Sequence, residues 1–250
     1  MNYKLGLCSI SFRKNTPEEI LAAMQTAGLE VIEWGSDIHA PCDDFERLQK
    51  IVKLQKQYGI KCCSYGTYFR LGQTEIQELP KYIEAAKVLG TNVLRLWCGT
   101  KSSKDYTPDE WQSLLDNCRA AVKIAEAHNV TLCLECHRGT ATDEAISALE
   151  IMAATDSPNF RMYWQPETIR TAKENIEYAK NLSKYTVNLH VFNWEPGLKK
   201  PLGEAVELWQ EYLENFNGEH CLLLEFMPDG KIESLKSEAE SLKLIVGGTL

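Results

Sequence analysis

The chain has 250 residues, of which 44% are hydrophobic and 25% are charged, a balance typical of a globular protein. Its formal net charge of −8 argues against a nucleic-acid partner, which usually requires a basic face. No stretch approaches the roughly 20 apolar residues of a membrane-spanning helix, and the length suits one large α/β domain over residues 1–250. The nine cysteines are odd in number, Cys62 and Cys63 are adjacent, and no signal peptide is recognised. We therefore expect reduced thiols, a cytoplasmic location and no membrane partner.

Short apolar runs of β-prone residues alternate with helix-like segments along the chain. The predicted strands cover residues 5–10, 31–36, 61–66, 93–98, 131–137, 161–166, 187–193 and 221–226. Helices are predicted over residues 17–28, 44–59, 76–90 and 108–128. Strands that alternate with helices predict a parallel sheet, and eight units of about 30 residues match a closed (β/α)₈ TIM barrel. A doubly wound open sheet is the alternative, but no glycine-rich dinucleotide motif follows the first strand.

The alternation of side chains along each strand predicts which polar residues point into the barrel. Glu33 in the second strand shares the inward parity with Arg95 and Trp97 in the fourth. In the fifth strand, Glu135 and His137 face inward by the same test, because the leucines between them suit the side packed against helices.

The last four strands each carry a polar inward residue near the end, namely Glu135, Gln165, His190 and Glu225. Active sites of TIM barrels lie at the carboxyl ends of the strands, so these side chains are expected to converge. Three oxygen donors and one nitrogen suit a divalent metal; we favour Mn²⁺, with Mg²⁺, Co²⁺ or Zn²⁺ as alternatives. A hydrogen-bonded core network is the other interpretation, but two buried carboxylates without a cation are costly.

Four segments carry a resemblance to a known superfamily: LCLECH with Glu135, NLHVFNW with His190, LLLEF with Glu225, and WGSDIH ending in His39. Over nearly its whole length the chain resembles the sugar isomerase and epimerase superfamily with the xylose-isomerase-like barrel. In ketose epimerases of that superfamily, Glu, Asp, His and Glu on strands five to eight hold a metal, and the two Glu residues move protons. The resemblance implies the same roles for Glu135, His190 and Glu225, whereas Gln165 stands where the superfamily usually has Asp.

This constellation predicts a metal-dependent isomerase or epimerase of a small sugar, polyol or hydroxy-ketone. One glutamate, Glu135 or Glu225, would remove a proton beside the substrate carbonyl to give a metal-bound enediolate, and the other would return a proton. A lyase or dehydratase using the same enediolate and a non-catalytic sugar-binding barrel are the alternatives. Nucleases that cut at abasic sites share the barrel, but the acidic chain shows no basic face for DNA. Self-association into a homo-oligomer is left open.

Further polar and aromatic residues near the predicted rim are candidate substrate contacts, because Trp faces pack on sugars while His and Arg bond hydroxyl groups. They are His39, Arg95, Trp97, His137 and Trp194. Lys199 and Lys200 follow the seventh strand, where barrels often bind phosphate, although a solvated lysine pair is the favoured interpretation.

Overall fold

The computed structural model describes residues 2–247, which form a closed (β/α)₈ TIM barrel. The barrel strands are β1 (Asn2–Cys8), β2 (Val31–Gly35), β3 (Lys61–Leu71), β4 (Val93–Cys98), β5 (Thr131–Glu135), β6 (Phe160–Trp164), β7 (Thr186–Val191) and β10 (Glu219–Leu224). The α-helices are α1 (Pro17–Ala27), α2 (Phe45–Tyr58), α3 (Leu79–Leu89), α4 (Pro108–His128), α5 (Ala145–Thr155), α6 (Ala172–Leu182), α7 (Val206–Leu213) and α8 (Leu235–Ile245). A small antiparallel hairpin, β8 (Trp194–Glu195) and β9 (Leu198–Lys199), follows β7. The predicted fold is confirmed.

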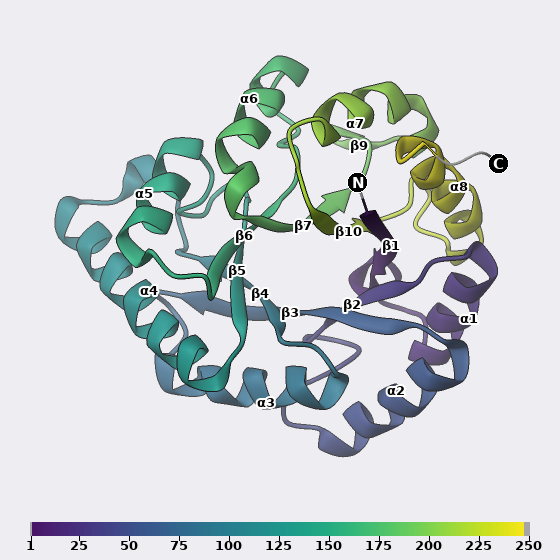
Figure 1. Ribbon diagram of the computed structural model, residues 1–250, viewed down its shortest axis with the longest axis horizontal. Helices are drawn as coiled ribbons and strands as arrows, with labels where there is room; N and C mark the ends of the chain where they lie inside the picture. The colour runs from purple at the N-terminus through teal and green to yellow at the C-terminus, as the bar shows by residue number, and fades with distance from the viewer. Residues whose placement is uncertain (1, 248–250) are drawn as a thin grey trace.

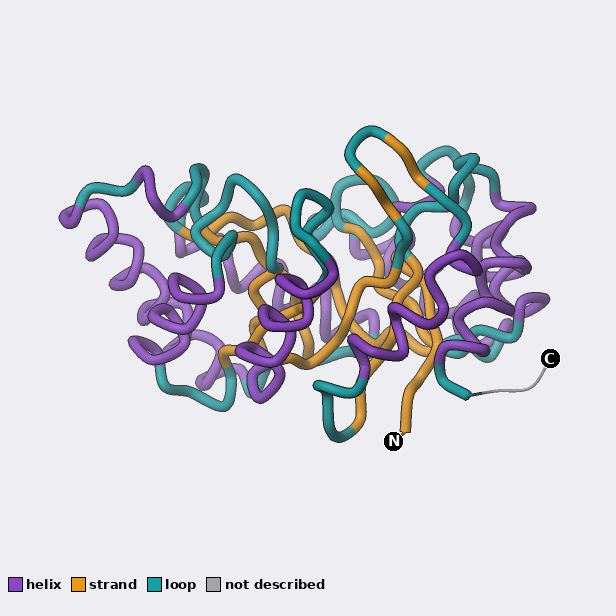
Figure 2. Tube along the Cα trace, turned by 90° about the horizontal axis from the view of Figure 1, so that it is seen from above, coloured by secondary structure: helices purple, strands orange, loops and turns teal. Residues whose placement is uncertain are grey.

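All neighbouring barrel strands are parallel, in the order β1-β10-β7-β6-β5-β4-β3-β2, and β1 closes the ring by pairing with both β10 and β2. Figure 1 shows the strands as an inner ring surrounded by the helices. Gly6 allows this closure, because a Cβ there would lie 2.2 Å from the carbonyl oxygen of Val31. Figure 2 shows the N-terminus at one end of the barrel, so the carboxyl ends of the parallel strands meet at the opposite end.

Local sequence signals explain where several helices begin and end. Thr16, Thr107 and Thr171 each form a capping box with a glutamate three residues later, which satisfies the first free backbone N–H groups of α1, α4 and α6. The predicted helix over residues 76–90 is α-helical only from Leu79, after one 3₁₀ turn at Ile76–Glu78. Within residues 2–247, no helix is long and apolar enough to cross a membrane.

The barrel interior is built in layers, because inward side chains recur every second residue along each strand. One layer is apolar and consists of Val31, Cys133, Tyr163 and Leu223. Two residues further toward the carboxyl ends, the same four strands carry Glu33, Glu135, Gln165 and Glu225. The leucines of β5, Leu132 and Leu134, face outward into the core shared with the helices. The acidic side chains inside the barrel therefore lie at the end at which TIM-barrel active sites form, while the layer below holds the neutral polar pair Asn188 and Tyr163, joined by a hydrogen bond of 2.6 Å.

Candidate active site

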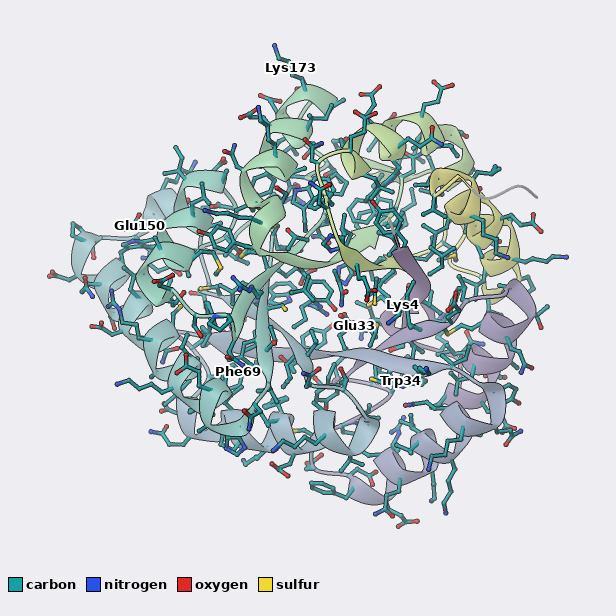
Figure 3. All side chains as sticks on the ribbon, viewed as in Figure 1. Lys4, Glu33, Trp34, Phe69, Glu150 and Lys173 are labelled. Atoms are coloured by element: carbon teal, nitrogen blue, oxygen red, sulfur yellow. The ribbon has the colours of Figure 1, made fainter. Side chains whose placement is uncertain are left out.

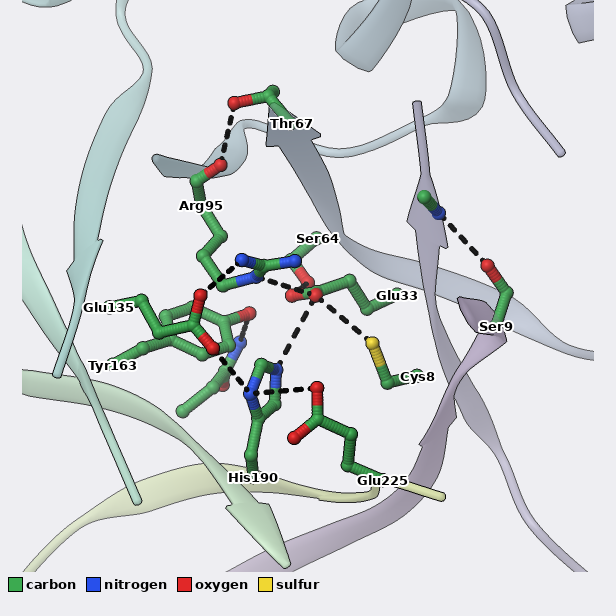
Figure 4. A network of polar contacts seen from close by, with 12 residues as sticks. Cys8, Ser9, Glu33, Ser64, Thr67, Arg95, Glu135, Tyr163, His190 and Glu225 are labelled. Carbon is green, nitrogen blue, oxygen red and sulfur yellow. Dashed lines mark hydrogen bonds and ion pairs between the residues drawn. The ribbon is translucent and has the colours of Figure 1, made fainter. Parts of the chain in front are cut away.

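An ion-pair network centred on Arg95 lies in the polar layer of the barrel (Figure 4). The Arg95 Nε group donates to Glu33 Oε1 at 2.9 Å, and Nη1 donates to Glu135 Oε2 at 2.5 Å. The second oxygen of Glu33 accepts a hydrogen bond of 2.7 Å from Ser64. The three charged side chains of this network are at most 4% exposed. Because a buried charge without a partner is costly, this guanidinium is what allows both carboxylates to remain ionised.

His190 occupies the centre of the candidate site and is fully buried. Its Nδ1 atom lies 3.2 Å from Gln165 Oε1, 3.4 Å from Glu135 Oε1 and 3.8 Å from Glu225 Oε1. Its Nε2 atom faces the opposite way, 3.4 Å from Glu33 Oε1, and has no hydrogen-bond partner of adequate geometry among the described residues. The four residues predicted as metal ligands are therefore brought together around one imidazole nitrogen.

The carboxyl groups of the site differ in how readily they take up a proton. Burial raises the pKa of Glu135, but Arg95 and His190 more than offset it and hold the pKa at about 2. Burial likewise opposes ionisation of Glu33, and Arg95 and His190 again lower its pKa below the usual range. For Glu225 burial prevails and raises the pKa, and the charge of Glu135 adds to this effect despite the opposing His190. Environments that separate the pKa values of neighbouring carboxyl groups are typical of acid/base catalysis.

The donor set fits a divalent cation. Burial lowers the pKa of His190, but Glu225 and the hydrogen-bonding groups around the ring raise it well above the usual value, so the cluster favours a cation at this point. Carboxylate and amide oxygens with one imidazole nitrogen suit Mn²⁺, Mg²⁺, Co²⁺ or Zn²⁺. The ligand atoms of Cys8, His190 and Glu225 also lie within 4.8 Å of one another. Without a metal, burial first and then Glu33 raise the pKa of Cys8 to about 12, so the thiol is protonated.

The residues predicted to contact substrate lie in three different places. The rings of Trp97 and His137 are stacked, with their centroids 4.5 Å apart, beside the carboxyl end of β5. Trp194, in the hairpin, stacks on Phe192 at 4.1 Å. Arg95 lies in the ion-pair network, with Glu33 and Glu135 at the two ends of its guanidinium.

His39 is not brought to this cluster by any contact of the described residues. Its Nδ1 atom lies 3.1 Å from Ser9 Oγ, and its Nε2 atom lies 3.2 Å from the carbonyl oxygen of Asn15. The His39 side chain is 1% exposed, and these two contacts join the segment after β2, which carries His39, to the segment after β1. Its role in substrate binding stays a prediction, and so does that of Arg95.

Two features of the site went beyond what sequence reasoning assigned. Glu33 is part of the central network, although only its inward parity in the apolar run VIEWG indicated this position.

Phe226, directly after Glu225, has a φ angle of 55°, which is rare for an aromatic residue and marks backbone strain of the kind found at functional sites. The backbone N–H of Phe226 donates to Ser11 Oγ at 2.8 Å, and that of Glu225 donates to the carbonyl oxygen of Val191 at 3.0 Å. These bonds fix the position from which Glu225 enters the site.

A family model described as the xylose isomerase-like TIM barrel matches residues 21–167. The chain belongs to this family. The predicted resemblance to xylose-isomerase-like barrels is thereby confirmed. The match ends before His190 and Glu225, so the assignment of those residues to the site comes from the geometry above.

Proteins similar to this chain include a dehydratase and a protein solved with bound zinc. A 3-dehydroshikimate dehydratase of Bacillus anthracis is 26% identical over 170 residues, which are 64% of this chain and 60% of the relative. The crystal structure of the probable 3-DHS dehydratase AsbF, involved in petrobactin synthesis in the same organism, superposes with a TM-score of 0.79 at 21% identity, covering 97% of this chain and 99% of AsbF. The IolI protein, solved with a bound zinc atom, gives a TM-score of 0.74 at 15% identity, with 98% of each chain covered. The two structural likenesses establish the fold.

Proposed function

We propose that the protein is a divalent-metal-dependent enzyme that removes a proton beside the carbonyl group of a small hydroxylated substrate. The observation that carries this proposal is the convergence of oxygens from Glu135, Gln165 and Glu225 within 3.2–3.8 Å of His190 Nδ1, at the carboxyl ends of the strands. These four residues would hold the metal, which when bound polarises the substrate carbonyl and lowers the cost of breaking the adjacent C–H bond.

Glu225 is the group best suited to exchange a proton with the substrate. Glu135 is held as a carboxylate by the 2.5 Å contact with Arg95. In the described part of the chain, no lysine or arginine forms an ion pair with Glu225, whose only charged partner is His190 at 3.8 Å. Because a group that catalyses proton transfer must be able to gain and lose its proton, Glu225 is assigned as general base and Glu135 as a fixed ligand.

One proton-exchanging carboxyl group favours elimination of water over epimerisation. Glu225 takes the proton from the carbon beside the carbonyl, a carbon–carbon double bond forms, and the hydroxyl group on the next carbon leaves. The same carboxyl group then returns its proton to the departing hydroxyl, which leaves as water and restores the Glu225 carboxylate. A dehydratase also agrees with the name of the relative from Bacillus anthracis, so 3-dehydroshikimate is the first substrate to test.

Isomerisation or epimerisation is the second candidate, and the position of Glu135 supports it. Only the Oε2 atom of Glu135 is paired with Arg95, while Oε1 faces His190 Nδ1 at 3.4 Å. This oxygen, which is not paired with Arg95, and the Glu225 carboxylate both lie near His190 Nδ1. Two carboxylates therefore flank the site, as a two-base mechanism requires.

The experiment that separates these functions begins with elemental analysis of the purified protein. The loaded protein is then incubated in D₂O with 3-dehydroshikimate and with a panel of ketoses, and the products are followed by NMR and mass spectrometry. A product lighter than its substrate by one water supports the dehydratase, whereas deuterium gained without loss of water supports the epimerase or isomerase. Glu225→Gln should abolish either activity, and Glu207→Gln, an exposed acid on α7, should not. Absence of metal together with absence of turnover and exchange would contradict the proposal and favour a binding barrel.

A further inference from the structure

The rim of the barrel carries cations that are not neutralised by carboxylates. Arg70 near the end of β3 and Lys199 in β9 form no ion pair with any carboxylate of residues 2–247. Arg13 pairs with Asp37, and Lys200 contacts Glu195 at 2.9 Å. The exposed Arg138, which lines a pocket together with Lys199, also forms no ion pair within residues 2–247. Of these unpaired cations, Arg70 and Lys199 are held against aromatic rings.

Arg70 is held in a fixed position beside the site. Strand β3 continues to Leu71, which places Arg70 in register with Trp97 on β4. The guanidinium carbon lies 4.2 Å from the Trp97 ring centroid, and Nη1 donates to the carbonyl oxygen of Gly99 at 2.7 Å. These two contacts use one face of the guanidinium and one of its nitrogens, so further N–H donors stay free.

The stack that holds Arg70 reaches the candidate active site. On the neighbouring strand the His137 ring is stacked on Trp97 at 4.5 Å, directly after the end of β5 that carries Glu135. Burial lowers the pKa of Arg70, and the charge of Glu135 opposes this effect. A ligand bound beside Glu135 would therefore lie within the field of the Arg70 guanidinium.

Lys199 lies on the opposite side of the rim, because β7 and β10 are across the barrel from β3 and β4. Its Nζ atom is 4.2 Å from the centroid of Phe226 and 5.3 Å from that of Trp194. Phe226 directly follows Glu225, so this ammonium group stands near the proposed general base.

The charge of the central cluster makes these cations significant. When ionised, Glu33, Glu135 and Glu225 carry three negative charges, which the single charge of Arg95 and the two charges of a divalent ion would balance. With a neutral centre, the charges of Arg70 and Lys199 at the rim remain available to a ligand, on a chain whose net charge is −8. A neutral sugar could accept hydrogen bonds from Arg70, but only an anionic group would also gain from the positive charge.

We propose that the substrate of this site carries an anionic group, a carboxylate or a phosphate, that binds the free N–H groups of Arg70, with Lys199 attracting it from across the rim. The proposal rests on the metal-dependent function proposed above and specifies its substrate class. Arg70 is thereby assigned as a substrate-binding residue. If its role were only to pack on Trp97, it would not distinguish charged from neutral ligands.

Calorimetric titration of the metal-loaded protein with two matched pairs of probes tests this assignment. D-Gluconate is compared with D-glucitol, and D-ribose 5-phosphate with D-ribose, so that each pair differs only at the end that bears the charge. The variants are Arg70→Met, which keeps an unbranched stem over Trp97, Arg70→Lys, which keeps the charge, and Lys199→Met. Lys173→Met is the control, because Lys173 projects into solvent from α6 at the edge of the molecule (Figure 3).

The wild-type protein should bind at least one anionic probe more tightly than its neutral partner. The pair with the larger difference in affinity shows whether the site prefers a carboxylate or a phosphate. Arg70→Met should weaken binding of that anion by roughly 10- to 100-fold, the range for a lost hydrogen bond between charged groups, and leave the neutral probe unchanged. Arg70→Lys should recover part of the loss, and Lys199→Met should cost about two- to fivefold.

Equal affinity for charged and neutral probes, or binding of neither anion, would overturn the proposal. It would also be overturned if Arg70→Met weakened both members of a pair alike. These results are distinct from failure of the proposed function. Anion-selective binding without turnover would refute the reaction alone, and turnover of a neutral substrate with no role for Arg70 would refute the substrate class alone.

Discussion

Replacement of Arg95 by methionine should destabilise the metal-free protein more than any exposed charge change. The substitution keeps the unbranched stem but removes the only guanidinium that contacts both Glu33 and Glu135 in the described chain. Removing one partner of a buried ion pair costs about 3–5 kcal/mol, because the remaining charges are left without compensation. Stabilities of natural domains are about 5–15 kcal/mol, so the loss should be easily measured.

The pKa of Glu135 provides a second measure of this magnitude. Burial raises that pKa and Arg95 is the largest opposing influence, with a net fall from 4.5 to about 2. A shift of this size corresponds to about 3 kcal/mol at neutral pH. Because the pKa is lower in the folded state, this stabilisation is complete above about pH 5 and is lost as the pH falls toward 2. The difference between Arg95→Met and wild type should therefore shrink on acidification.

Urea unfolding, followed by circular dichroism between pH 7 and pH 4 in the presence of a chelator, measures the effect directly. Lys101→Met is the matched control, because Lys101 forms an exposed pair with Glu110 at 2.8 Å and should cost less than about 1 kcal/mol. A loss below about 1 kcal/mol for Arg95→Met, or a larger loss that does not change with pH, would refute the reasoning. The second result would mean that the side chain acts by packing rather than by its charge.

Three further substitutions test separate parts of the site. Glu225→Gln should lower kcat by about 10²- to 10⁴-fold with little change in unfolding free energy, measured on the substrate identified by the D₂O screen; full retained turnover would exclude it as the base. Gln165→Asp adds a negative charge at a metal ligand and should raise affinity for Mn²⁺, measured by calorimetry; unchanged affinity would place the metal away from this side chain. Gly66→Ala should cost about 1–3 kcal/mol in unfolding free energy, because its Cβ would lie 2.7 Å from Glu33 Oε1, which is tied to the ion-pair network. Gly203→Ala is its control, since the nearest atom is a serine hydroxyl at 3.2 Å, and equal losses would show that the network tolerates the extra methyl group.

The sequence determined the barrel and the inward parity of its polar residues. Hydrophobic side chains recur about every two residues in a strand and every 3.6 residues in a helix. These short repeats can be recognised in the sequence itself, because they arise from local hydrogen bonding and burial. The same parity identified Glu135, Gln165, His190 and Glu225, and the structure brings these four side chains to one imidazole nitrogen. Their assignment as metal ligands and the roles of the two glutamates stay predictions.

The pairing of these charges depends on how the ring of strands closes, which no local pattern contains. Arg95 was placed inward by sequence as a candidate for substrate, but closure of the ring sets its guanidinium between Glu33 on β2 and Glu135 on β5. His39 looked equally suited to substrate, yet its ring nitrogens are used by the segment after β1. Such pairings join residues up to 62 positions apart, and their strength depends on burial and distance that no local pattern contains. For that reason the sequence predicted which side chains point inward, while the fold showed that Arg95 pairs with Glu33 and Glu135 and not with Glu225.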